Sequence, residues 1–180
     1  MGTQDFAKFV ASQQEAHVKA EMDWAGLRDE WLKNLDSLYQ KVGGFLQEYI
    51  PDSISYRFAK IELNEPSIGR YLAKRMDIKI GRQRVCLFPV GTLLIGCRGR
   101  VDVVGSAGRG QILLVDAKAR GASDLIQVRI NTKDSALTTT SPQNLPASWV
   151  WKIVTNGAQK RFVDLEKESF TALLMEVANA

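Results

Sequence analysis

The sequence predicts an α+β protein in which helices from both ends of the chain cover one face of an antiparallel sheet of about six strands. Three observations lead to this prediction. The first fifty residues repeat apolar side chains at spacings of three and four, residues 54–164 contain segments that alternate apolar and polar residues, and residues 166–178 return to the helical spacing. A chain of 180 residues suits one domain, so we predict a single domain over residues 1–180.

The predicted helical segment, residues 1–50, is clearest from Trp24 onward. Its apolar stripe consists of Trp24, Leu27, Trp31, Leu35, Leu38, Val42, Phe45 and Tyr49. The pattern before Trp24 is weaker, so we predict a short leading helix, a break between Asp23 and Gly26, and a longer helix that ends at Pro51. The closing helix, residues 166–178, carries four apolar residues on one side: Phe170, Leu173, Leu174 and Val177.

Short turns connect the predicted strands. They are Gly81-Arg82-Gln83, residues 89–91, the glycine-rich segment 105–110, and residues 156–160, which begin with Asn156-Gly157. Connections this short favour an antiparallel meander, because parallel strands need crossovers of a dozen or more residues. Residues 124–130 alternate and predict a further strand, whereas residues 131–148 are polar, contain two prolines and predict an exposed loop.

Composition indicates the general class of the protein. The formal net charge of +4 permits an anionic partner without requiring one. No apolar run is long enough to span a bilayer, and the N-terminal residues lack a signal-peptide pattern, so we expect a cytoplasmic protein with no membrane partner. Cys86 and Cys97 lie in apolar, strand-like segments, so we expect two buried thiols, with a disulfide between them as the alternative.

The segment from Gly99 to Gly121 carries the charged residues best suited to chemistry. Asp102 lies on one predicted strand of a hairpin, and Asp116-Ala117-Lys118 follows an apolar run on the other. This arrangement resembles the signature of the PD-(D/E)xK nuclease-like superfamily. The resemblance implies a Mg²⁺-dependent nuclease in which Asp102 and Asp116 bind the metal and Lys118 is the catalytic lysine.

The same charges also have a purely structural interpretation. If the turn centres near residues 107–108, Arg100 lies opposite Asp116 and Asp102 opposite Leu114, so the charges form cross-strand pairs on a solvated face. If the pairing shifts by one step, Asp102 faces Asp116, and two facing carboxylates favour a metal ion. We favour the structural interpretation, which gives this hairpin no catalytic, metal-binding or cofactor-binding residue.

Positive charge gathers on two predicted hairpins. One group, a candidate patch for an anion or a partner, consists of Arg98, Arg100, Arg109, Lys118 and Arg120. A second run consists of Arg70, Lys74, Arg75, Lys79, Arg82 and Arg84. Together they predict a stripe that contacts an acidic protein surface or a nucleic-acid backbone. Few aromatic residues interleave with these charges, which disfavours single-strand binding because that binding depends on base stacking.

The sequence therefore favours a binding protein over an enzyme. We expect the domain to bind a protein, a nucleic acid or a small ligand through the uncovered face of the sheet or the 131–148 loop. The Mg²⁺-dependent nuclease based on residues 99–121 is the alternative function, and a homodimer through the open face is an alternative assembly. Trp149 and Trp151 are expected in the core, against Trp24 or Trp31.

Overall fold

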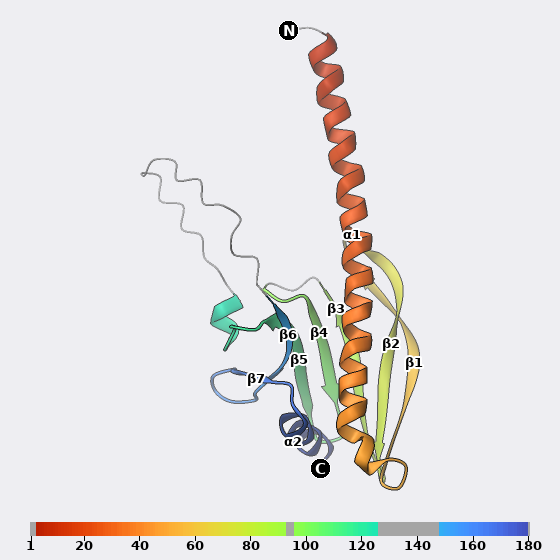
Figure 1. Cartoon of the computed structure of the whole chain (residues 1–180), viewed down its shortest axis with the longest axis vertical. Helices are drawn as coiled ribbons and strands as arrows, with labels where there is room; N and C mark the ends of the chain where they lie inside the picture. The colour runs from red at the N-terminus through yellow and green to blue at the C-terminus, as the bar shows by residue number, and fades with distance from the viewer. Residues whose placement is uncertain (1–2, 93–95, 126–147, 180) are drawn as a thin grey trace.

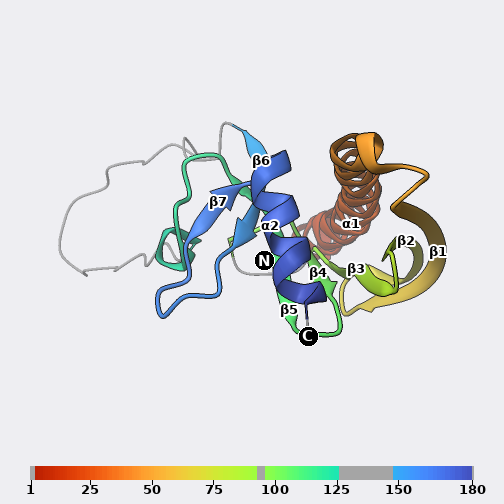
Figure 2. The same cartoon turned by 90° about the horizontal axis from the view of Figure 1, so that it is seen from below.

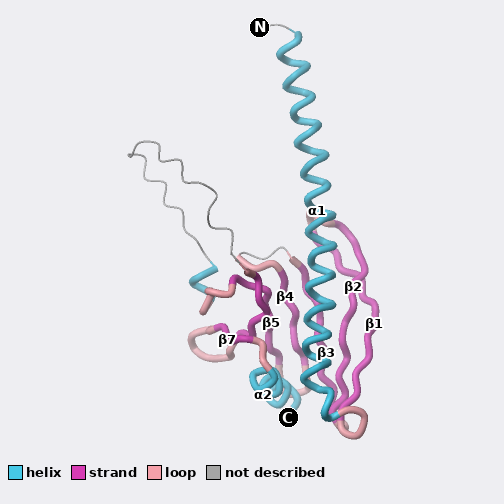
Figure 3. Tube along the Cα trace, viewed as in Figure 1, coloured by secondary structure: helices cyan, strands magenta, loops and turns pink. Residues whose placement is uncertain are grey.

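The computed structural model describes residues 3–92, 96–125 and 148–179 (Figure 1). Within them, helix α1 (Thr3–Leu46) precedes one sheet of seven strands along the chain, and helix α2 (Lys167–Ala178) follows it. The strands are β1 (Ile54–Glu65), β2 (Gly69–Ile80), β3 (Gln83–Gly91), β4 (Gly99–Val104), β5 (Arg109–Asp116), β6 (Trp149–Val154) and β7 (Phe162–Asp164). Each pairs antiparallel with the next (Figure 3). The predicted α+β meander is confirmed, with one strand more than expected.

The sheet curves around the helices, which share its inner face (Figure 2). The predicted stripe of α1 is buried at Trp31, Leu35, Leu38 and Val42, and all four predicted apolar residues of α2 are buried as well. The Trp31 and Trp151 rings lie 6.2 Å apart between centroids, which confirms the expected packing of Trp151 in the core. Trp149 is partly buried at the edge of the same cluster.

Helix α1 is continuous over 44 residues, so the predicted break between Asp23 and Gly26 is wrong. Residues 3–46 contain no proline. Gly26, at the predicted break, lowers helix stability but keeps its backbone hydrogen bond, so the helix continues. The N-terminal part of α1 projects beyond the sheet (Figure 1), where Phe6 and Phe9 are 68% and 58% exposed. No helix in the described part of the chain is both long enough and apolar enough to cross a bilayer.

One predicted turn and one predicted strand differ from the structure. Residues 89–91, predicted as a turn, form the end of strand β3. A proline is tolerated there because this end of β3 pairs with β4 alone and has an irregular register. The start of the predicted strand 124–130 lies in a 3-10 helix, η2 (Ala122–Leu125), and residues 126–147 lie outside the described residues. Residues 155–161 join β6 to β7 and contain the predicted turn 156–160, so this hairpin is confirmed. The Asn156 side chain donates a hydrogen bond to Glu176 of α2 at 2.8 Å, which connects this loop to the helix.

The β1–β2 hairpin extends beyond the rest of the sheet. Strand β2 pairs with β3 only from Met76 to Ile80, whereas it pairs with β1 along its whole length. The buried positions of β2 change from Met76 and Ile78 to Tyr71 and Ala73, because the two-stranded ribbon twists strongly where it has no third strand. The far half of the hairpin therefore curls toward α1 (Figure 1). In the strand order, β1 and β7 are the two edges of the sheet.

Cross-strand pairing identifies the outer face, which is turned away from the helices. Residues directly opposite each other on neighbouring strands share a face. The row of Met76, Leu87 and Val103 is fully buried on the helix side. The adjacent row, which includes Asp77 and Cys86, must therefore lie on the outer face.

Candidate anion-binding surface

The β4–β5 hairpin adopts a register that the sequence did not predict. Asp102 lies opposite Gln111 and Arg100 opposite Leu113, so both predicted registers are wrong. Residues 105–108 form the turn, which confirms a hairpin turn in the glycine-rich segment but centres it earlier in the chain than expected.

Helix α2 explains this register. The N–H of Ala107 donates to the carbonyl oxygen of Val177 at 2.9 Å, which holds the turn against the end of α2. A Cβ atom at Gly110 would lie 2.4 Å from a methyl group of Leu173, so α2 packs directly on the backbone there. The register therefore depends on contacts with a helix that begins more than fifty residues later in the chain.

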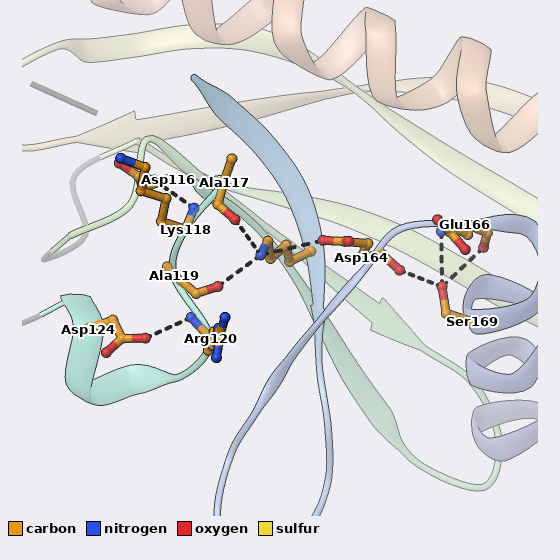
Figure 4. A network of polar contacts seen from close by, with 10 residues as sticks. Asp116, Ala117, Lys118, Ala119, Arg120, Asp124, Asp164, Glu166 and Ser169 are labelled. Carbon is orange, nitrogen blue, oxygen red and sulfur yellow. Dashed lines mark hydrogen bonds and ion pairs between the residues drawn. The ribbon is translucent and has the colours of Figure 1, made fainter. Parts of the chain in front are cut away.

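This register separates the two carboxylates of the nuclease signature. Asp116 lies five residues beyond Gln111, the residue opposite Asp102, which is about 17 Å along the strand. Because five is odd, Asp116 also projects from the other face of the sheet. Its carboxylate accepts the backbone N–H of Lys118 at 2.7 Å (Figure 4). The arrangement does not support shared binding of Mg²⁺ by Asp102 and Asp116, or a catalytic role for Lys118.

Metal ligands do not gather elsewhere in the described residues, where no three His, Cys, Asp or Glu side chains come together. The two cysteines are both free thiols, Cys97 buried and Cys86 partly buried, so the alternative of a disulfide between them is not observed. Burial raises the pKa of the Cys97 thiol, which keeps it protonated.

Lys152 on β6 is a buried lysine beside the turn that follows β5, and sequence reasoning missed it. Its side chain donates from Nζ to the carbonyl oxygens of Ala117 and Ala119, both at 2.9 Å. The same Nζ lies 3.4 Å from the Asp164 carboxylate. Figure 4 shows these acceptors around one amine. The sequence signal for a buried lysine was a charged residue within the otherwise apolar strand β6. The contacts give Lys152 a structural role, since its ammonium group connects β6 to the turn after β5 and to β7.

The structure disperses the five residues of the first predicted basic patch. Arg98 lies on the helix side, where it hydrogen-bonds Glu30 of α1 at 2.9 Å and its guanidinium lies over the Trp149 ring. Lys118 and Arg120 are exposed in the turn after β5. Arg100 and Arg109 alone among the five line a common hollow on the outer face.

A basic hollow of about 380 Å³ lies on the outer face of the β1–β2–β3 part of the sheet. Its cations are Arg57, Arg75, Lys79 and Arg84. The cross-strand row Ser55–Lys79–Arg84 supplies two of them, and the row Arg57–Asp77–Cys86 supplies a third. The second predicted basic run therefore contributes here, although Lys74 turns to the helix side and pairs with Asp36 at 2.9 Å.

Asp77 is the acid of this hollow, and its charge is already balanced. Arg75 contacts the carboxylate at 2.7 Å, and Arg57 lies 3.6 Å from it. Burial opposes ionisation of Asp77, but hydrogen bonds from Arg75 and Cys86, with the nearby positive charges, outweigh burial and lower its pKa. Burial, together with the hydrogen bond to Asp77, raises the pKa of the Cys86 thiol.

A second hollow of about 300 Å³ lies on the same face over β4, β5 and β6. Its cations are Arg100, Arg109 and Lys160. Arg100 donates two hydrogen bonds to Asp102, at 2.7 and 2.9 Å, which neutralise this carboxylate. Phe88 connects the two hollows. It lies opposite Asp102, which lines the second hollow, and its ring centre is 5.0 Å from the guanidinium of Arg75, which lines the first. The two hollows therefore adjoin.

The two hollows together form one surface, the outer basic face. Its cations are Arg57, Arg75, Lys79, Arg84, Arg100, Arg109 and Lys160. With Asp77 and Asp102 as the lining acids, seven cations against two carboxylates leave five positive charges. Sequence reasoning missed Arg57 and Lys160, because each comes from outside the two basic hairpins. Guanidinium and ammonium groups in this number suit the oxygens of phosphate groups.

Comparisons with protein-family models, with curated proteins and with solved structures found no match. Function is therefore inferred from the charge and geometry of the outer basic face. Lys79, Arg84, Arg109 and Lys160 are exposed and have no acidic partner within the described ranges. These four side chains are free to bind an anionic ligand.

Proposed function

We propose that the protein binds the phosphate backbone of double-stranded nucleic acid through its outer basic face. The observation that carries this proposal is the excess of five positive charges spread from β1 to the loop after β6 on one side of the sheet. Four spacings of about 4.8 Å separate β1 from β5, so the part of the surface on these strands is about 19 Å wide. Each strand of a duplex advances about 3.4 Å per phosphate along the axis, so this width spans about five phosphates.

The aromatic residues of this face favour a duplex over a single strand. Phe88 is partly buried, and the Arg75 guanidinium already covers its ring. Tyr56 also lines the first hollow, but its ring packs against Phe58 and its hydroxyl lies beside Gly43 of α1. Binding of single strands relies on exposed aromatic faces on which bases stack. The outer basic face offers cations for the backbone instead, a mode of contact that carries little sequence information. We therefore expect binding with low sequence preference and strong salt dependence.

Fluorescence anisotropy with a labelled 24-base-pair DNA duplex tests the proposal. We expect wild-type protein to bind in low salt, and the double variant Lys79→Ala/Arg84→Ala to bind about tenfold more weakly because two phosphate contacts are lost. Lys33→Ala is the matched control, since Lys33 is an exposed lysine on α1, away from the outer basic face. It should bind as wild type does.

Two results would contradict the proposal. One is the absence of duplex binding by the wild-type protein at about 50 mM salt, where phosphate contacts are strong. The other is an equal loss of affinity in the double variant and the Lys33→Ala control. Tighter binding of the single-stranded 24-mer than of the duplex would contradict the preference for double strands.

A further inference from the structure

Strand β1 is a free edge of the sheet. It is 12 residues long, pairs with β2 on one side, and has no partner strand on its other side within the described residues. Its register with β2 has no bulge, and its sequence has no proline. Proteins normally shield such edges with prolines, bulges, charged side chains or covering segments, because the free N–H and C=O groups bind another strand. Of these devices β1 has charged side chains, Arg57, Lys60 and Glu62, so a second strand can bind here only where it matches these charges.

We propose that β1 pairs antiparallel with β1 of a second copy of this chain, with the twofold axis passing at Ile61. A twofold axis perpendicular to the sheet places the central residue opposite the same residue of the second copy. A residue before the centre then lies opposite the residue that is equally far beyond the centre in the second copy. In this register Lys60 of each copy lies opposite Glu62 of the other. The dimer gains backbone hydrogen bonds along the edge and two Lys60–Glu62 pairs of opposite charge.

The charges of β1 select this register. If the twofold axis passed at Arg57, Lys60 or Glu62, that residue would face the same residue of the second copy, and two like charges would meet. Centring on Phe58 or Ala59 would place Lys60 and Glu62 opposite uncharged residues. Among the six positions from 57 to 62, the centre at Ile61 alone matches Lys60 with Glu62.

Both charged residues are available for this contact. Lys60 is exposed and has no acidic partner in the described ranges, while Lys74, opposite it on β2, already pairs with Asp36. Glu62 lies 4.0 Å from Arg70, and both of these side chains are more than half exposed. A surface pair at this distance contributes little stability, so Glu62 is free to pair with Lys60 of the second copy.

Such a dimer would join two sheets edge to edge. A twofold axis perpendicular to the sheet leaves both outer basic faces on the same side, so two binding surfaces would act on one ligand and raise its apparent affinity. The self-association itself needs no nucleic acid. Its test is therefore carried out on the protein alone, and its outcome is separate from that of the proposed function.

Mass measurement by sedimentation or by light scattering, over a concentration range from about 1 to 200 μM, tests the dimer. Wild-type protein should approach twice its monomer mass of 20.0 kDa. Lys60→Glu and Glu62→Lys should each weaken the dimer about tenfold, because each turns both attractive pairs into repulsive ones. The double variant Lys60→Glu/Glu62→Lys should restore the dimer, because the opposite charges are exchanged.

The exposed residue Lys33 on α1 again supplies the control, and Lys33→Glu should dimerise as wild type does. Thermal unfolding monitored by circular dichroism shows that each variant is folded. Three results would overturn the proposal: a wild-type monomer at every concentration, single variants that dimerise like wild type, or a double variant that stays monomeric.

Discussion

At the residue scale, Gly99 sets how closely α1 approaches the sheet. A Cβ atom at Gly99 would lie 2.2 Å from the ring of Trp31, well inside contact distance. Trp31 is 1% exposed and also packs on Trp151, so its ring has little room to move. The close approach of α1 to the sheet at this point is therefore possible because position 99 has no side chain.

We expect Gly99→Ala to lower the free energy of unfolding by about 1–3 kcal/mol, because the added methyl group displaces a buried ring. Gly108→Ala is the control, since a Cβ atom there meets nothing within 4 Å. Urea denaturation measures both values. An equal effect of the two substitutions would show that Trp31 does not restrict position 99.

Asp77 makes stability depend on pH. Its pKa is lower in the folded protein than in the unfolded chain, so the folded state gains stability from the ionised carboxylate above the unfolded pKa, about 4. This gain is lost as the pH falls through the lower, folded pKa. Asp77→Asn should therefore destabilise the protein at pH 7 and have little effect near pH 2. Urea denaturation across this range checks the trend, and a difference that grows on acidification would contradict it.

At the element scale, Lys152 ties three segments together. Strand β6 carries the side chain, the turn after β5 supplies the two carbonyl acceptors, and β7 supplies Asp164 (Figure 4). Because Lys152 is only 6% exposed, its ammonium group depends on these partners in place of water. The contact fixes the path of residues 117–119 beside the sheet.

Lys152→Met keeps most of the side-chain volume and removes the donor. We expect it to lower the free energy of unfolding by about 1–3 kcal/mol, since two carbonyl groups lose their partner. Hydrogen exchange should accelerate most in residues 117–121, and Lys118→Met, an exposed lysine in the same turn, should change neither quantity. Uniform acceleration throughout the protein would instead indicate a global loss of stability.

The elements themselves were largely predictable from the sequence. The helical spacing of Trp31, Leu35 and Leu38 and the alternation along the strands reflect burial of one face, which is a local signal. The β4–β5 register was not predictable, because α2 sets it by packing on Gly110 and Ala107 from far along the chain. The continuity of α1 was also missed, since a weak apolar pattern does not by itself end a helix.

At the scale of the whole molecule, the meander assigns different properties to the two faces of one sheet. The inner face receives α1 and α2, and the outer face collects cations from strands that are distant in sequence. Part of this surface was visible in the sequence, because Arg75, Lys79 and Arg84 alternate within one hairpin. Arg57 and Lys160 join it only through the folded topology, as cross-strand pairing and the final turn bring them there.

The salt dependence of duplex binding tests the role of the outer basic face most directly. Each phosphate contact adds about −0.9 to the slope of log K against log salt concentration. The four unpaired cations therefore predict about −3.6 per protomer for wild type, and about −1.8 for Lys79→Ala/Arg84→Ala. A wild-type slope near zero, or equal slopes for the two proteins, would contradict binding of the phosphate backbone by this face.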